Sequence, residues 1–470
     1  MTTTRTAHAA NFGWLGILRV GLVQAALGAM VVLTTSTLNR VMVVELALPA
    51  LLPGFLVALH YLVQVARPRM GFGSDVGGRR TPWIVGGMAV LATGGVLASV
   101  ATAWMGSNRS AGIALAVFAF CSIGLGVSAS GTSLLVMLAK RVPVGRRAAA
   151  ATIVWMMMIF GFAVTSGLAG KLLEPYSPMR LVLVTAGVCS AAFVLAMLAI
   201  YKLEGQTSAV VNATESTPTN QPAFRQALVQ VWAEPAARQF TIFVFISMLA
   251  YSAQDLILEP FAGTVFGFTP GASTSLSGIQ HGGVLVGMIL VALAGVLANW
   301  VCVRWPHKPA LRHIGSLRGW TVGGCIASAV ALAGLSAAGF VGPGWPLKAT
   351  VFALGVANGA FSIGAISSMM RLAGQGQHAR EGVRMGLWGA AQAVAFGLGG
   401  LMGTAASDIA RWLIASPGAA YASVFGFEAA LFVLSAVLAW QVGKPTAQAA
   451  PDAGSLTQRQ PISFSLASTS

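Results

Sequence analysis

Twelve long apolar stretches divide this chain, and they constrain its fold more than any other feature. A helix needs about 20 apolar residues to cross the hydrocarbon core of a bilayer. With 56% hydrophobic and only 9% charged residues, the chain has too little polar surface for a soluble protein of 470 residues. We therefore predict an all-α membrane protein. The predicted helices are Ile17–Val43, Pro49–Ala66, Pro82–Trp104, Ala111–Ala139, Ala149–Gly170, Leu181–Tyr201, Gln239–Phe261, Ser277–Val303, Gly319–Gly339, Trp345–Met370, Val383–Ala406 and Ala419–Gln441.

The stretches fall into two groups of six, which predicts two six-helix halves, residues 1–201 and 239–441. Residues 202–238 between them are rich in polar residues and proline and are typical of a cytoplasmic linker. Residues 442–470 are polar with three prolines, which predicts a disordered cytoplasmic tail.

The basic residues predict the orientation of the chain. If both termini are cytoplasmic, the inside segments hold 22 of the 28 Lys and Arg residues, in agreement with the positive-inside rule. The polar residues 1–11 lead into a full-length helix without a small-residue cleavage pattern, so we expect no cleaved signal peptide.

Several function classes find no support in the residues. The net charge of +16 comes from bases in loops beside apolar helices, where orientation and anionic lipid explain it, so we expect membrane lipid but no nucleic acid as a partner. The four cysteines lack metal-ligand spacing, so we predict no metal site made of protein ligands alone. The chain has no nucleotide loop and no hydrolase or metalloprotease motif, and we expect no enzymatic activity of its own.

The run Gly71–Pro82 (GFGSDVGGRRTP) lies between the second and third predicted helices. Its paired arginines resist entry into hydrocarbon, so the loop is expected in the cytoplasm. It resembles the loop between helices 2 and 3 of the major facilitator superfamily, a resemblance that implies a twelve-helix bundle and a cytoplasmic gate. A second basic segment between helices 10 and 11 is expected to act similarly. The predicted gate residues are Gly71, Ser74, Asp75, Arg79, Arg80, Arg380, Glu381 and Arg384.

Ionisable residues at membrane depth are costly and are therefore candidates for function. Asp255 and Glu259 are four residues apart on one helical face, so they need a cation, a shared proton or an outside partner. Arg40, Glu45 and His281 are expected near the same outer end, which predicts one polar cluster toward the periplasm. A purely structural alternative, in which these groups pair to close the bundle, stays open.

Four segments together carry a closer resemblance: Thr37–Leu46, Tyr251–Gly263, Leu276–Leu285 and Arg380–Gln392. They look like the PucC family, a branch of the major facilitator superfamily found in phototrophic bacteria. The resemblance implies a multi-pass protein of the inner (intracytoplasmic) membrane that handles (bacterio)chlorophyll, with carotenoid or lipid as further apolar ligands. It also implies, as partners, bacteriochlorophyll synthesis enzymes and light-harvesting or reaction-centre subunits. The compact loop Ser74–Pro82 looks more like the branch associated with bacteriochlorophyll synthase.

A chlorin pigment needs an apolar slot and one axial donor for its magnesium, and neutral imidazole is a good donor. His281 is the first candidate, because Gly282 and Gly283 would leave room for a flat ring and Gln280 could bond a ring carbonyl. His60 is the second, although a hydrogen bond to a neighbouring helix is the more ordinary use of such a histidine. A competing interpretation pairs His281 with Asp255 or Glu259.

We expect the protein to bind (bacterio)chlorophyll or a late precursor and to deliver it from synthesis enzymes to apoproteins. Three other functions stay open: a proton-coupled transporter of a small solute, a scaffold that binds no pigment, and an accessory subunit of bacteriochlorophyll synthase.

Overall fold

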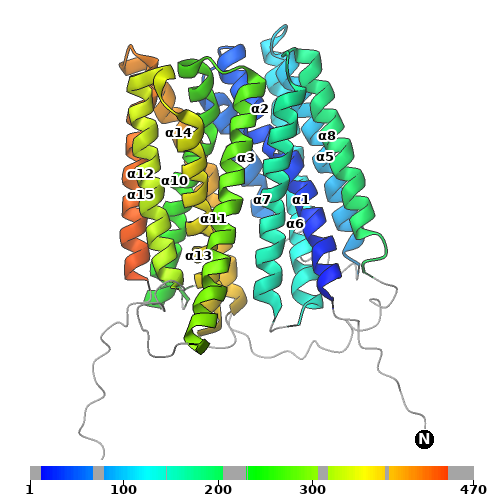
Figure 1. The fold of residues 1–470 in the computed structure, drawn as a ribbon. Helices are drawn as coiled ribbons and strands as arrows, with labels where there is room; N and C mark the ends of the chain where they lie inside the picture. The colour runs from blue at the N-terminus through cyan, green and yellow to red at the C-terminus, as the bar shows by residue number, and fades with distance from the viewer. Residues whose placement is uncertain are drawn as a thin grey trace, which may run out of the picture.

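The computed structural model describes residues 12–66, 79–143, 146–204, 229, 231–304, 316–375 and 381–442. Within these ranges the regular structure is helical throughout (Figure 1). The N-terminal half contains α1 (Trp14–Thr35), α2 (Thr37–Arg40), the π-helical turn η1 (Val41–Glu45), α3 (Leu51–Val63) with the 3-10 turn η2 (Gln64–Ala66), α5 (Thr81–Trp104), α6 (Arg109–Arg141), α7 (Arg147–Leu172) and α8 (Pro178–Ile200). The C-terminal half contains α10 (Pro235–Phe266), α11 (Pro270–Arg304), α12 (Leu317–Val341), the 3-10 turn η6 (Gly342–Gly344), α13 (Leu347–Gln375), α14 (Glu381–Leu413) and α15 (Pro417–Gln441).

Eleven membrane-spanning segments in the described residues are long and apolar enough to cross a bilayer, and the shorter apolar α3 stands at the place of the remaining predicted helix. The prediction of an all-α membrane protein is therefore confirmed. The first predicted helix differs in one respect: it breaks at Ser36, whose backbone lies at φ −99° and ψ −81°, and continues as α2 and η1. An apolar run reveals that a helix is present but not where its axis bends.

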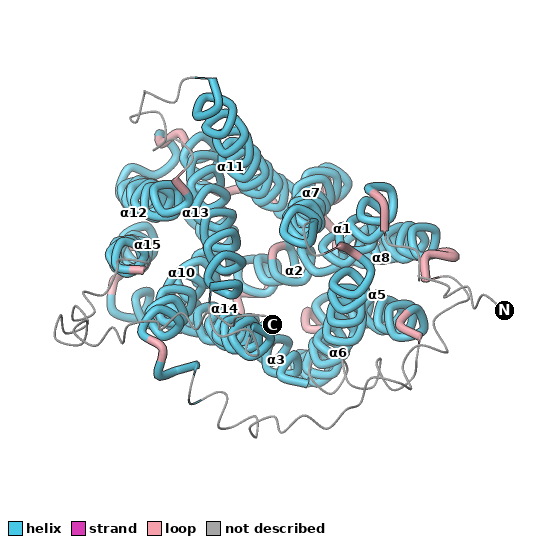
Figure 2. Tube along the Cα trace, turned by 90° about the horizontal axis from the view of Figure 1, so that it is seen from below, coloured by secondary structure: helices cyan, strands magenta, loops and turns pink. Residues whose placement is uncertain are grey.

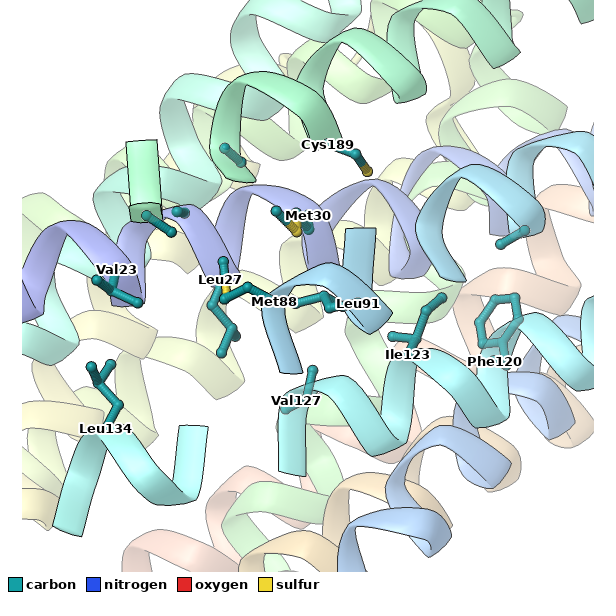
Figure 3. Close-up of a cluster of buried hydrophobic side chains, with 14 of the residues drawn as sticks. Val23, Leu27, Met30, Met88, Leu91, Phe120, Ile123, Val127, Leu134 and Cys189 are labelled. Atoms are coloured by element: carbon teal, nitrogen blue, oxygen red, sulfur yellow. The ribbon is translucent and has the colours of Figure 1, made fainter. Parts of the chain in front are cut away.

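Each half has its own hydrophobic core. The larger core is built from side chains of α1, α5, α6 and α8, among them Leu27, Leu91 and Ile123 (Figure 3). A second core joins α10, α12, α13 and α15. A small third core, in which Ile159 of α7 meets Met288 of α11, lies where the halves touch. The bundle is thus two packed units with a seam between them (Figure 2).

The halves meet along two helix pairs, α7 with α11 and α3 with α14. Small residues allow these backbones to approach closely. A Cβ atom on Gly170 would lie 2.6 Å from the carbonyl oxygen of Gly271, and one on Gly54 would strike the Thr404 side chain. A larger residue at either glycine would therefore push the halves apart.

We call the end of the bundle that carries residues 12 and 442 the proximal end, and the opposite end, with the turns after Glu45 and Phe266, the distal end (Figure 1). Under the orientation predicted from the basic residues, the proximal end faces the cytoplasm.

Candidate functional site

The distal end is closed by Arg40, a charged side chain that is only 2% exposed. Arg40 forms an ion pair with Glu45, and its Nη2 donates to the carbonyl oxygen of Phe268 at 2.6 Å. Residues five apart on a regular α-helix point about 140° away from each other. The π-helical turn η1 brings Arg40 and Glu45 onto one side, so the pair depends on this local change of helix type.

Three further side chains form hydrogen bonds to the C-terminal half: Ser36 at the junction of α1 and α2, and Thr37 and Asn39 of α2. The Ser36 hydroxyl donates to Oε1 of Glu259, and Asn39 Nδ2 donates to the carbonyl oxygen of Leu256 at 2.5 Å. The hydroxyls of Thr37 and Thr274 lie 3.0 Å apart. The charge of Arg40 also acts on Glu259. These bonds hold the end of the first membrane span against α10 and α11.

A carboxylate from α14 joins the same closure. Asp408 accepts hydrogen bonds from the backbone amides of Ala50 and Leu51 and so caps the start of α3 from the other half.

A hollow of about 510 Å³ at the distal end is lined by Arg40, Glu45, Tyr176 and residues of the α10–α11 turn. Burial raises the pKa of the Tyr176 phenol, and the negative charge of Glu45 adds to this while Arg40 opposes it.

Asp255 lies one helical turn deeper than Glu259. Its Oδ1 accepts a hydrogen bond from Nε2 of Gln280 at 3.1 Å. The ring of Tyr251, one turn before Asp255 on α10, packs against the ring of Phe396, with 5.9 Å between the ring centroids. The Phe396 ring in turn contacts the ring of Tyr61 on α3, with 5.4 Å between centroids. Asp255 therefore borders an aromatic contact that bridges the two halves at mid-depth.

His281 does not join the distal cluster. Its Nδ1 lies 2.8 Å from the backbone carbonyl oxygen of Ser277 on the same helix. Its ring packs edge-on against the ring of Phe162 on α7, with 5.0 Å between the ring centroids. A carbonyl can only accept, so Nδ1 carries a proton, and in the neutral ring Nε2 then keeps its lone pair. The five residues predicted as one cluster are thus reached through different contacts: Arg40 pairs with Glu45, the charges of Arg40 and Asp255 both act on Glu259, Asp255 bonds Gln280, and His281 contacts Ser277 and Phe162.

The two glycines beside His281 have different surroundings. A Cβ on Gly282 would meet nothing within 4 Å, whereas one on Gly283 would lie 2.4 Å from the carbonyl oxygen of Phe352 on α13. The space expected from the sequence at both glycines is thus present at Gly282 alone, and Gly283 allows α11 and α13 to pack closely.

His60 lies away from this region. It is 3% exposed, and its Nε2 is 2.8 Å from Nε2 of Gln64, one turn further along the same helix. Its ring packs edge-on against Tyr61. His60 therefore has a hydrogen bond with a residue of its own segment, Gln64.

Most of the predicted gate falls where the structure makes no statement. Gly71, Ser74, Asp75 and Arg380 lie outside the described residues, and the side chains of Glu381 and Arg384 are likewise not described. Arg79 is exposed and Arg80 is buried at the start of α5.

Glu204 is the unexpected group at this end. Its carboxylate accepts from the amides of Arg80 and Thr81, at 2.7 and 2.8 Å, and from the Thr81 hydroxyl at 2.6 Å. Burial alone would raise the pKa of Glu204, but these bonds and the Arg80 charge hold it below its ordinary value. The sequence places Glu204 in the predicted linker, whereas in the structure its side chain caps the start of α5.

Two further acids were not singled out from the sequence. Glu428 of α15 is 1% exposed, and Asp408 lies two residues beyond the predicted end of its helix. The rule that every ionisable residue at membrane depth is a candidate would have found Glu428, since it is the acidic residue of the last apolar stretch. No sequence signal pairs Asp408 with α3.

Comparisons with known proteins agree with this architecture. Solved structures of the peptide transporter POT in complex with sulfate (TM-score 0.63, 14% identity, 93% of this chain and 97% of that one) and of a bacterial homologue of the lysosomal transporter Spinster (TM-score 0.59, 15% identity, 90% and 94%) share the fold. The expected major facilitator architecture is thereby confirmed.

Two relatives align over nearly their whole length. The chain is 52% identical to the bacteriochlorophyll synthase 44.5 kDa chain of Rhodobacter capsulatus, over 91% of this chain and 95% of the relative. It is 29% identical to protein PucC of Cereibacter sphaeroides, over 90% of each. The PUCC protein family matches residues 37–447. This multi-pass membrane chain therefore belongs to the PucC family.

Proposed function

We propose that the protein binds (bacterio)chlorophyll or a late precursor within the membrane and delivers it from synthesis enzymes to light-harvesting or reaction-centre apoproteins. The names of its relatives, a bacteriochlorophyll synthase chain and PucC proteins, support a role related to photosynthetic pigment. The proposed location is the inner membrane of a phototrophic bacterium, with both termini in the cytoplasm.

The observation that carries the proposal is the state of His281. Nδ1 donates to the Ser277 carbonyl, so in the neutral ring Nε2 keeps the lone pair that an axial donor needs. The residue is 6% exposed at the seam between α7 and α11. A magnesium-chlorin accepts such an axial donor, so the residues present fit the ligand.

The surroundings of His281 suit a flat apolar molecule. Phe162 offers an aromatic edge, and Gly282 has open space where a side chain would stand. One N–H of the Gln280 amide donates to Asp255, and the second N–H could donate to a carbonyl group of the pigment ring. These residues would bind and orient the pigment, while the distal closure would keep water and solutes from crossing.

The test is gentle purification from a phototrophic membrane followed by absorption spectroscopy of the wild type, His281→Phe and His60→Phe. We expect pigment to copurify with the wild type and His60→Phe, and we expect His281→Phe to remain folded and lose pigment or shift its long-wavelength band. Unchanged pigment and spectrum in His281→Phe would exclude this histidine as the ligand. A wild type without pigment would contradict the proposed function itself.

The 52% identity to a chain named for bacteriochlorophyll synthase favours a second candidate, an accessory subunit of that enzyme. This role predicts that the synthase polypeptide copurifies with the protein and that its activity falls when the protein is deleted. Pigment delivery alone predicts normal synthase activity and a loss of assembled complexes.

A further inference from the structure

Glu428 is a buried acid that none of the roles above uses. It lies near the middle of α15, and neither of its carboxylate oxygens has a hydrogen-bond partner among the described residues. An ionised carboxylate without partners in an apolar interior costs several kcal/mol or more, so such a group persists only in its neutral form.

A second unpartnered side chain lies at the same level. Phe261 of α10 contacts Tyr421 of α15 at 5.5 Å. The two helices are antiparallel. Gln254 lies two turns before Phe261 on α10, and Glu428 lies two turns after Tyr421 on α15, so Gln254 and Glu428 are at the same depth. Gln254 is fully buried, and both atoms of its amide also lack partners in the described part of the chain.

Among the described residues, the charge that acts on Glu428 is that of another acid. Asp255, next to Gln254 in sequence, acts electrostatically on Glu428. The other described titratable groups within about two turns on the packed helices are Tyr251 and Glu259 of α10, Asp408 of α14, Tyr421 of α15, Cys325 of α12, and His281 of α11, whose Nδ1 is already bonded to its own helix. The described basic side chains of this half lie at helix ends: Arg238, Arg304, Arg318, Lys348 and Arg411.

We propose that Asp255 and Glu428 form a proton-binding pair inside the C-terminal half, with Glu428 holding the proton. Two carboxylates that repel each other without a cation retain at least one proton between them. Gln254 and Gln280 provide amide donors beside the pair, and Gln280 already bonds Asp255.

The pair is placed to respond to movement of the two halves. Asp255 is only half-buried, and the neighbouring Tyr251 reaches the Tyr61–Phe396 contact between the halves. Glu428 belongs to α15, which packs against α10, α12 and α14 of its own half. Separation of the halves would admit water to Asp255 and favour its ionisation, and the resulting charge would keep the proton on Glu428. Proton binding and the arrangement of the halves are thus linked, whatever the cargo is.

Infrared spectroscopy of the purified, lipid-reconstituted protein tests this directly. A protonated carboxyl group has a carbonyl stretching band distinct from that of a carboxylate. We expect such a band at neutral pH in the wild type, its loss in the isosteric Glu428→Gln, and its retention in the control Glu174→Gln, which removes an exposed acid. In Asp255→Asn we expect the band to remain at neutral pH and to disappear at a different pH from that of the wild type.

Two results would overturn the proposal. One is a wild-type spectrum without a band that Glu428→Gln removes. The other is an identical pH dependence in the wild type and Asp255→Asn, which would show that the two acids do not interact. Because Asp255→Asn keeps Glu428 intact, the second comparison remains decisive even if Glu428→Gln fails to fold.

Discussion

Asp408 of the C-terminal half accepts a 2.8 Å hydrogen bond from the backbone amide of Leu51, the first residue of α3 in the N-terminal half. A helix start normally finds its cap in its own chain segment. Here the cap comes from the opposite half, so α3 is fully capped only while the distal end is closed. The same carboxylate also accepts from Ala50 at 3.0 Å.

Replacing Asp408 with alanine should therefore open the distal end. Loss of an N-cap costs about 1 kcal/mol, which corresponds to a several-fold shift between closed and open forms. We expect faster labelling of a cysteine placed at Thr274, in a background without the native cysteines. Ser177→Ala removes the N-cap of α8, which lies within one half, and should leave labelling unchanged. Equal labelling in all three proteins would show that Asp408 does not hold the halves together.

The neighbouring glycines of α11 should respond oppositely to alanine. Gly283→Ala brings a Cβ against the α13 backbone, which cannot move aside cheaply, and should lower stability by about 1 to 3 kcal/mol. Gly282→Ala meets open space and should be neutral or slightly stabilising, because alanine is the better helix former. Thermal unfolding in detergent measures both. A destabilised Gly282→Ala would contradict the packing described for this helix.

Stability should depend on Glu204 at acid pH. Its pKa is lowered in the folded protein, so its contribution is present above the unfolded-state value, 4.5, and is lost as pH falls through the folded-state value. Glu204→Gln should lower stability at neutral pH, by about 1 kcal/mol, and weaken the loss of stability on acidification. Glu174→Gln removes a carboxylate at the other end and should retain the wild-type acid sensitivity. A pH profile of Glu204→Gln that runs parallel to that of the wild type would refute the cap.

The orientation can be tested by reporter fusions. The distribution of basic residues predicts that fusions near Thr217 and at Ser470 report cytoplasm, and that a fusion near Asn108 reports periplasm. Asn108 is the N-cap of α6 at the distal end, so its result also assigns the distal closure to one side of the membrane. A periplasmic signal at Thr217 would contradict the predicted orientation.

Hydropathy was sufficient to predict the order of the apolar helices, because apolar length is what a bilayer requires, and in the described residues only α3 is shorter than a full span. It placed their ends less well. The seventh predicted helix, Gln239–Phe261, is α10 from Pro235 to Phe266, since polar and proline residues can continue a helix once neighbouring helices satisfy its backbone.

The site was predictable only in part. Depth in the membrane marked Arg40, Asp255, Glu259 and His281 correctly as buried or half-buried polar groups. Their partners were not predictable, because the bonds to Phe268 and Leu256 go to backbone carbonyls, which every residue possesses. Sequence patterns cannot distinguish one carbonyl from another.

The π-helical turn that joins Arg40 to Glu45 also determines which mutations this segment can tolerate. A π-turn holds one residue more than an α-helical turn, so deletion of one residue between Arg40 and Glu45 would restore α-helical spacing and leave the two charges four residues apart, which is again one face of the helix. The apolar side chains of Val41–Val44 can be exchanged for one another at modest cost, whereas one residue added between the two charges would turn them about 120° apart on an α-helix. In this stretch an insertion is therefore more damaging than a single deletion or a substitution, because the ion pair tolerates a spacing of four or five residues between its two charges but not of six.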